Sequence, residues 1–183
     1  MKLISVNVGL PREVEWRGRI VTTSIWKAPA NGRVVVRALN VDGDQQSDLT
    51  VHGGPDKAVY VYPSEHYAFW RTELPDMELT WGAFGENFTT EGLFETDVMI
   101  GDRIQIGSAE FQVTQPRLPC FKLGIRFGRD DMIKRFLRSR TSGFYVAVLH
   151  EGEVGAGDPI EIIEHDQNGI SVAAVATRYV IES

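Results

Sequence analysis

Residues 98–114, VMIGDRIQIGSAEFQVT, decide the fold class that the sequence predicts. The segment divides into three short runs in which apolar residues recur, and Gly-Asp and Gly-Ser pairs typical of turns separate the runs. We therefore expect strands over 98–100, 103–106 and 110–114. Such closely spaced short strands are typical of β-rich domains.

The same kind of signal continues on both sides of this segment. Runs rich in β-branched and aromatic residues predict further strands over 3–8, 20–26, 34–39, 58–62, 144–149 and 160–163. Asn31-Gly32 predicts a hairpin turn between the second and third of these. Apolar periodicity predicts helices over 64–74 and 130–138, whereas 170–181 fits either a strand or a short helix.

Many short strands and few helices predict a mainly β (α+β) fold, a single β-barrel-like domain with a few covering helices. The chain has 183 residues, which suits one domain, and it contains no repeat, linker or low-complexity tract. We therefore treat residues 1–183 as a single domain.

Composition excludes several classes of protein. The net charge of −6 argues against a nucleic-acid polymer as partner, because phosphate backbones require a basic surface. A single cysteine excludes an internal disulfide, a multi-thiolate zinc site and an iron–sulfur cluster. The first residues do not resemble a signal peptide and no apolar run reaches the length of a membrane span, so we expect a cytoplasmic protein without membrane contact.

The single cysteine, Cys120, has an unusual setting. Pro116 and Pro119 stiffen the segment before it. Arg117 and Lys122 flank it, and neighbouring cations favour the reactive thiolate over the thiol. We interpret Cys120 as a nucleophile or metal ligand; the alternative is a buried cysteine that acts as a small hydrophobe.

Two further clusters have candidate binding residues. His52-Gly53-Gly54 is followed by Lys57, and such a glycine turn can form an anion-binding concavity. The alternative is a simple glycine bend beside a solvated lysine. Residues 82–90 place Asn87 among glycines, where a turn before a strand is the locally favoured interpretation.

In this order the clusters resemble the MOSC family, named for the C-terminal domain of molybdenum cofactor sulfurases, and its bacterial YiiM-type branch most closely. The resemblance covers about residues 20–165. The matching segments are Lys27 with Gly43-Asp44-Gln45, residues 48–67, Phe84-Gly85-Glu86-Asn87, Ile100-Gly101-Asp102, residues 115–123, Gly143-Phe144-Tyr145 and Gly155-Ala156-Gly157-Asp158.

The resemblance implies a molybdenum cofactor, a pyranopterin dithiolene that carries molybdenum and a phosphate. It makes Cys120 the catalytic residue and the molybdenum ligand, or else a sulfur carrier. The residues expected to bind the cofactor are Lys27, His52, Gly53, Gly54, Lys57, Asn87, Arg117 and Lys122. We expect no flavin, iron–sulfur cluster or pyridoxal phosphate in this chain.

The implied reaction reduces an N-hydroxylated base or a related N-oxygenated small molecule. Two electrons and two protons convert the hydroxylamino group to an amine and release water, and a separate reductase supplies the electrons. The alternative is a sulfur-carrier or cofactor-delivery module that uses Cys120 without turning over a small molecule. YiiM-type proteins usually carry a further C-terminal helical segment, and we expect it to be absent or truncated here because the sequence reaches only Ser183.

Overall fold

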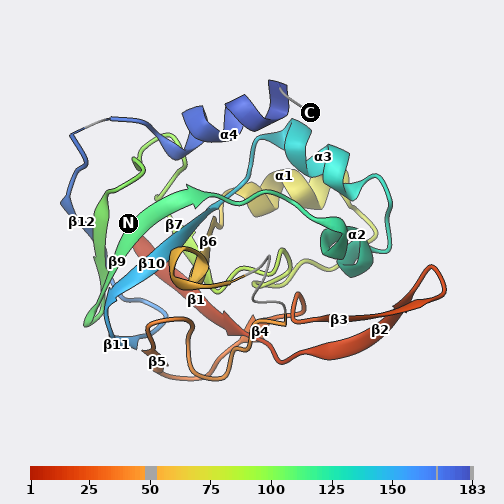
Figure 1. Ribbon diagram of the computed structural model, residues 1–183, viewed down its shortest axis with the longest axis horizontal. Coiled ribbons are helices and arrows are strands. Elements are labelled where there is room, and N and C mark those ends of the chain that lie inside the picture. Colours follow the sequence, from red (N-terminus) through yellow and green to blue (C-terminus); the bar gives the residue numbers. More distant parts are fainter. Residues whose placement is uncertain (48–52, 168, 182–183) are drawn as a thin grey trace.

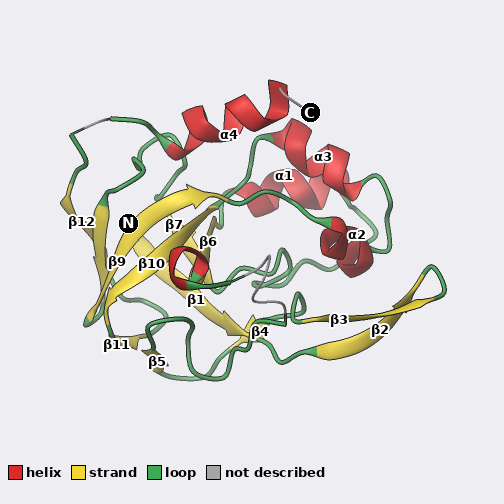
Figure 2. Cartoon of the chain, viewed as in Figure 1, coloured by secondary structure: helices red, strands yellow, loops and turns green. Residues whose placement is uncertain are grey.

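A computed structural model describes residues 1–47, 53–167 and 169–181 of the chain (Figure 1). Its main element is a sheet of eight strands, beside which the helices gather on one side (Figure 2). The strands are β1 (Lys2–Val8), β2 (Arg12–Trp16), β3 (Arg19–Thr23), β4 (Ala28–Pro29), β5 (Val34–Val36), β6 (Val59–Pro63), β7 (Phe88–Glu91), β8 (Arg103–Ile106), β9 (Ala109–Pro116), β10 (Phe144–His150), β11 (Gly152–Val154) and β12 (Ile160–Glu164). The helices are the 3-10 turn η1 (Pro55–Lys57), α1 (His66–Glu73), α2 (Phe121–Phe127), α3 (Met132–Ser139) and α4 (Val172–Ile181).

The large sheet has the order β12-β8-β9-β10-β6-β7-β1-β4. Neighbouring strands in this sheet are antiparallel, except that β6 and β7 are parallel. The amide of Leu3 donates to the carbonyl of Asp158 at 2.9 Å, and that of Ile160 donates to Met1 at 3.1 Å. These bonds bring β1 beside the start of β12, so the sheet curls strongly, although its described strands do not close into a barrel. The predicted fold class, mainly β with covering helices, is confirmed.

The segment that predicted the fold forms two of its three expected strands. β8 and β9 pair as a hairpin across Gly107 and Ser108. The strand expected over 98–100 is wrong, because Met99 forms only an isolated bridge, to Ser171, and Ile100 lies in a turn. The buried Asp102 carboxylate accepts the amide of Met99 at 2.9 Å and so removes that donor from any sheet ladder.

The hairpin expected at Asn31-Gly32 is also wrong. β3 instead pairs with β2 through the two-residue loop Arg17-Gly18, and β5 pairs with β11, far away in sequence. Arg17 and Gly18 have φ values of 52° and 73°, the left-handed geometry that matches the twist of a tight hairpin. In Figure 1 this hairpin extends away from the body of the molecule.

The helices expected over 64–74 and 130–138 are present as α1 and α3, and the ambiguous C-terminal segment is the helix α4. The sequence did not predict α2, which begins directly after Cys120. The sequence does contain a typical end signal for this helix, Gly128, and in the structure this glycine ends α2 in the left-handed conformation with φ 62°. No helix in the described part of the chain is long and apolar enough to cross a membrane.

The core has two parts. Aliphatic side chains with Phe88, Phe111 and Phe144 fill the concave side of the sheet. A second, aromatic cluster lies under α1, α2 and α3, where the fully buried Trp70 stacks on Phe136 with ring centres 5.8 Å apart. Arg117, in the segment before Cys120, lies over two rings of this cluster, Tyr60 and Phe136.

Gly143, at the start of β10, gives the first testable prediction. It has φ 61°, and an added Cβ would lie 2.5 Å from the carbonyl oxygen of Val61 and 2.8 Å from both the Tyr60 and Tyr62 rings. We expect Gly143→Ala to lower the free energy of unfolding by about 3 kcal/mol. Gly128 has φ 62° but open space around it, so Gly128→Ala should cost only about 1 kcal/mol. Urea denaturation of both variants measures the difference, and equal losses would show that the contacts of Gly143 do not matter.

Candidate functional site

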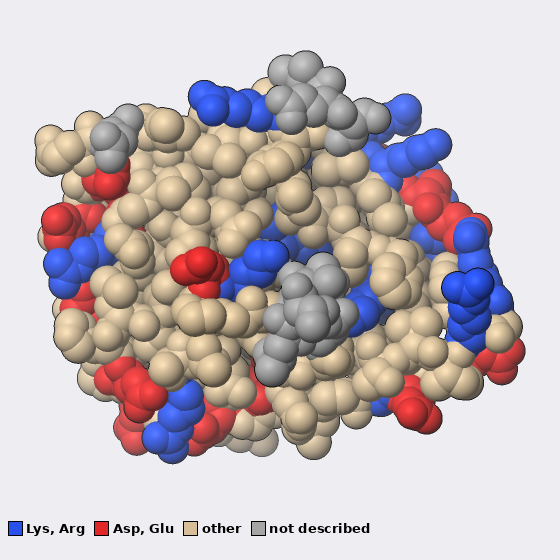
Figure 3. Space-filling view, in the orientation of Figure 1, with Lys and Arg blue, Asp and Glu red and all other residues tan. Residues whose placement is uncertain are grey.

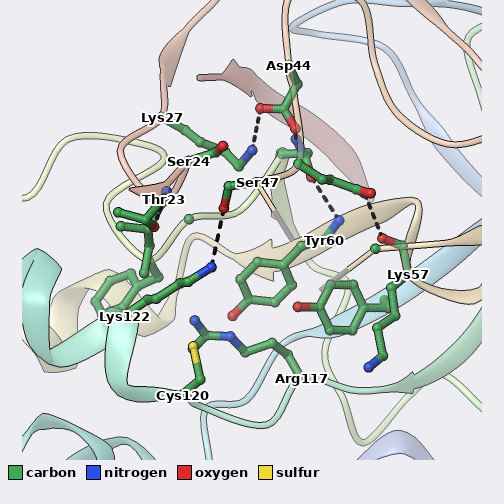
Figure 4. Close-up of a pocket in the computed structure, with 17 residues that line it drawn as sticks. Thr23, Ser24, Lys27, Asp44, Ser47, Lys57, Tyr60, Arg117, Cys120 and Lys122 are labelled. Atoms are coloured by element: carbon green, nitrogen blue, oxygen red, sulfur yellow. Dashed lines mark hydrogen bonds and ion pairs between the residues drawn. The ribbon is translucent and has the colours of Figure 1, made fainter. Parts of the chain in front are cut away.

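A cavity of about 100 Å³ opens where the segment after β3, the loop before residue 48, β6 and the start of α2 come together (Figure 4). Most of the residues that line it carry polar side chains, among them several cations and one thiol. The lining residues are Thr23, Ser24, Ile25, Lys27, Asp44, Gln46, Ser47, Gly53, Lys57, Tyr60, Phe84, Gly85, Asn87, Arg117, Cys120, Lys122 and Tyr145.

Most residues that the sequence singled out meet at this cavity. Those that line it are Lys27, Gly53, Lys57, Asn87, Arg117, Cys120 and Lys122. Gly54 is described but does not line the cavity, and His52 lies outside the described residues. Segments nearly one hundred positions apart in sequence therefore supply one site, although the role of each residue remains a prediction.

Cys120 lies at the N-terminal boundary of α2, where its extended backbone turns the chain into the helix. Its carbonyl accepts the amide of Leu123 at 2.9 Å, and its side chain is partly exposed. The amide of Arg117 donates to Gly143 at 3.2 Å and anchors the other end of the proline-stiffened segment to β10. The thiol is thus held at a fixed place beside the cavity, with its Sγ next to the Arg117 guanidinium (Figure 4).

Arg117, the cation that Figure 4 shows beside this thiol, is only 6% exposed. Its guanidinium lies 5.2 Å from the Tyr60 ring centre and 5.0 Å from that of Phe136. Its Nη1 is buried and finds no hydrogen-bond partner among the described residues. A buried charged donor without a protein partner is costly, so this nitrogen is available to a ligand atom or a water molecule.

The phenols beside Arg117 stay neutral. Burial raises the pKa of Tyr145 and, more strongly, that of Tyr60, although the charge of Arg117 opposes the rise in both. Neither tyrosine therefore balances the guanidinium with a negative charge near neutral pH.

A second buried charge, Lys27, is balanced inside the protein. Its Nζ forms an ion pair with Oδ1 of Asp44, and the two side chains are only 8% and 1% exposed. Burial lowers the pKa of Lys27, while the Asp44 carboxylate opposes the change. The other Asp44 oxygen accepts Nδ2 of Asn87 at 2.9 Å.

Asn87 directs its side-chain hydrogen bonds to other parts of the protein. Besides Asp44, its Nδ2 reaches the Asn7 carbonyl at 3.3 Å, and its Oδ1 accepts the amide of Tyr60 at 3.1 Å. It therefore positions Asp44 and the start of β6. Asp44 was not selected as a site residue from the sequence, because no local pattern predicts its hydrogen bond to Asn87, 43 positions away.

The remaining lining groups favour a polar, anionic ligand. Lys122 Nζ donates to Ser47 Oγ at 3.3 Å, and the buried Ser24 Oγ has no partner among the described residues. Figure 3 shows lysine and arginine side chains at the centre of this face, whereas acidic side chains lie mostly towards its rim. The protein is acidic overall, yet this cavity presents cations and free donors.

Of four aromatic residues on the segments that form the site, two line the cavity and two do not. Phe84 and Tyr145 line the cavity. Trp26 instead lies under the guanidinium of Arg12, 3.6 Å from the ring centre, and Phe121 is 50% exposed. The cavity wall is therefore only partly aromatic.

These groups fit a molybdenum cofactor of the kind that the sequence resemblance implies. Arg117 and Lys122 suit its anionic parts, Ser24 and Arg117 carry unsatisfied donors, and Cys120 is a soft donor. Histidine, cysteine and acidic side chains form no group of three in the described chain that could hold a metal ion, so a metal here would bring its other ligands with it. A cavity of about 100 Å³ is smaller than sites that enclose a whole ligand, and the cofactor would extend into the open mouth.

Comparisons with known proteins show which family the chain resembles. A model of the MOSC domain matches residues 48–161. The chain is 45% identical over 170 residues to YflK of Bacillus subtilis, covering 93% of this chain and 76% of YflK. It is 35% identical over 165 residues to a protein of Gibberella moniliformis named "Reductase", covering 88% of this chain and 29% of that protein. The crystal structure of YiiM from Geobacillus stearothermophilus superposes with a TM-score of 0.81 at 37% identity, covering 99% of this chain and 84% of that one.

Proposed function

The chain belongs to the MOSC domain family, and from this premise we propose that it binds the molybdenum cofactor in the Cys120 cavity and reduces N-hydroxylated bases or related N-oxygenated compounds. The observation that carries the proposal is the Cys120 thiol, held beside the unsatisfied guanidinium of Arg117 in a cavity rich in cations. The relatives support an oxidoreductase role, since one of them is named "Reductase".

Each lining group has a role in this proposal. When bound, the cofactor would supply the two-electron chemistry of the reduction. Cys120 offers a soft thiolate to the metal. Arg117 and Lys122 hold anionic groups, and the Ser24 hydroxyl adds a hydrogen bond. Asn87 and the Lys27–Asp44 pair keep the loop around residue 44 in place.

We infer that a separate reductase supplies the electrons. A chain with one cysteine cannot ligate an iron–sulfur cluster, and its sequence has no flavin signature. In the proposed cycle this reductase delivers two electrons, with two protons taken up, for each hydroxylamino group converted to an amine and water.

The direct test is to purify the protein from a host that makes the molybdenum cofactor. Mass spectrometry measures molybdenum per chain, and an assay with a chemical reductant follows the reduction of an N-hydroxylated base. We expect near-stoichiometric molybdenum and formation of the amine. A folded protein without molybdenum would overturn the proposal, and a loaded protein that leaves the base unchanged would refute its reductase part.

Lys122 gives a prediction for binding alone. A charged hydrogen bond to an anionic ligand contributes about 1.5–3 kcal/mol, so we expect Lys122→Gln to release the cofactor about tenfold or more faster. Lys134, an exposed lysine of α3 that does not line the cavity, provides the matched control Lys134→Gln. Molybdenum retained after timed dialysis compares the variants, and equal retention would exclude Lys122 from the cofactor site.

One observation favours a second candidate function, a sulfur-carrier or cofactor-delivery module. Leu118 and Phe121 stand on either side of Cys120 and are 45% and 50% exposed. Exposed apolar side chains around a thiol suit the docking of a protein that exchanges sulfur with it. Incubation with a persulfide donor and intact mass measurement would then show one added sulfur atom on the wild type and none on Cys120→Ala.

A further inference from the structure

A second cavity, of about 370 Å³, lies on the helical side of the molecule. It is bounded by the segment after β9, the end of α3, the start of α1 and the inner face of α4. Arg117 lines both this cavity and the Cys120 cavity, whereas Leu118 and Pro119 line only the second. The proline-stiffened segment before Cys120 is therefore a wall that the two cavities share.

The second cavity has the size and apolar surface of a small-molecule site. Its volume falls within the range of about 300–1,000 Å³ typical of ligand pockets. Phe136, Leu137 and Leu118 provide apolar walls on one side, and Ala176 of α4 provides a small side chain on the other. A compact apolar body fits against these residues.

The charges at this cavity favour an anion. Glu95 supplies a carboxylate, but its oxygens lie 3.0 and 2.9 Å from Nε2 of His66, and one of them accepts the amide of Gly143 at 2.6 Å. The Glu95 carboxylate is thus already hydrogen-bonded within the protein. Arg117 retains an unsatisfied buried Nη1, and the exposed Arg140 forms no ion pair with any described residue.

From these observations we propose that the second cavity binds a small amphipathic carboxylate. Its carboxylate would lie between the guanidinium groups of Arg117 and Arg140, and its aromatic or branched body would pack on Phe136, Leu137 and Ala176. Because Arg117 borders both cavities, a bound carboxylate and a bound cofactor would share its guanidinium.

Benzoate and its neutral analogue benzamide are the probes for this site. Isothermal titration calorimetry of the purified chain with each compound separates the charge contribution from the apolar one. We expect saturable binding of benzoate and at least fivefold weaker binding of benzamide. Equal affinities, or no saturable binding of benzoate by the folded protein, would overturn the proposal.

Two pairs of variants locate the binding. Arg140→Gln should weaken benzoate about fivefold, whereas Arg138→Gln, a change of an exposed arginine of α3 that does not line the cavity, should have no effect. Ala176→Phe should abolish binding by filling the cavity, and Ala174→Phe on the exposed face of α4 should preserve it. If neither Arg140→Gln nor Ala176→Phe changes the affinity for benzoate, benzoate binds elsewhere and this site is refuted.

Discussion

Cys120→Ala is expected to lose nearly all bound molybdenum and to reduce N-hydroxylated bases more than about 100-fold more slowly than the wild type. In the proposed site Cys120 is the protein's one soft donor, since the chain has no second cysteine. Removing it leaves the cationic groups to hold the cofactor without a bond to the metal. Metal analysis and the reduction assay, run beside the wild type, measure both losses.

The variant should remain folded, which makes the test interpretable. The Cys120 side chain is partly exposed and makes no capping hydrogen bond at the start of α2. The backbone bond from Leu123 to the Cys120 carbonyl does not depend on the side chain. Circular dichroism and the denaturation midpoint should therefore match those of the wild type.

Cys120→Ser is the sharper comparison, because it keeps the size and polarity of the side chain. If the softness of sulfur matters, the serine variant should lose molybdenum as the alanine variant does. Full molybdenum content and full activity in both variants would show that Cys120 neither binds the metal nor takes part in the reaction. Full molybdenum with activity lost in both would separate metal binding from catalysis.

The sequence predicted the parts of this protein that local chemistry determines. The alternation after Gly101 predicted β8 and β9, and the paired prolines with flanking cations singled out Cys120, which lies at the cavity. The glycine cluster around Asn87 was interpreted as a turn before a strand, and β7 begins at the next residue.

Features that depend on distant residues were missed. The Asn31-Gly32 turn has a good hairpin sequence, but β5 finds its partner in β11, more than one hundred residues later. Likewise no local pattern shows that Asp44 pairs with Lys27 and Asn87, or that Arg117 is buried over Tyr60 and Phe136. Tertiary pairing decides these features, and a single sequence does not encode it in neighbouring residues.

The Lys27–Asp44 pair gives a second large expected effect on stability, similar in size to that of Gly143→Ala. Asp44→Asn keeps the shape of the side chain but removes the paired carboxylate of the buried Lys27 ammonium group and leaves only the more distant charge of Glu86 to oppose its burial. Removing one partner of a buried ion pair costs about 3–5 kcal/mol, and we expect a loss of about 3 kcal/mol in the free energy of unfolding at pH 7. Urea denaturation measures this loss.

The loss should depend on pH in a defined direction. Burial already lowers the pKa of Lys27 below its ordinary value of 10.5, and without Asp44 the pKa should fall further. Between this lowered pKa and 10.5 the unfolded chain binds more protons than the folded one, so the stability of Asp44→Asn should rise with pH relative to the wild type.

The double variant Lys27→Met/Asp44→Asn isolates the unpaired charge. It carries the same amide side chain at position 44 as the single variant but removes the ammonium group, so it should recover more than about 1 kcal/mol and lose the pH dependence. If the double variant is no more stable than Asp44→Asn, the loss comes from the hydrogen bonds that Asp44 accepts from Gly9 and Asn87 rather than from the buried charge. That result would show that neutral hydrogen bonds, rather than an ion pair, stabilise the loop around residue 44.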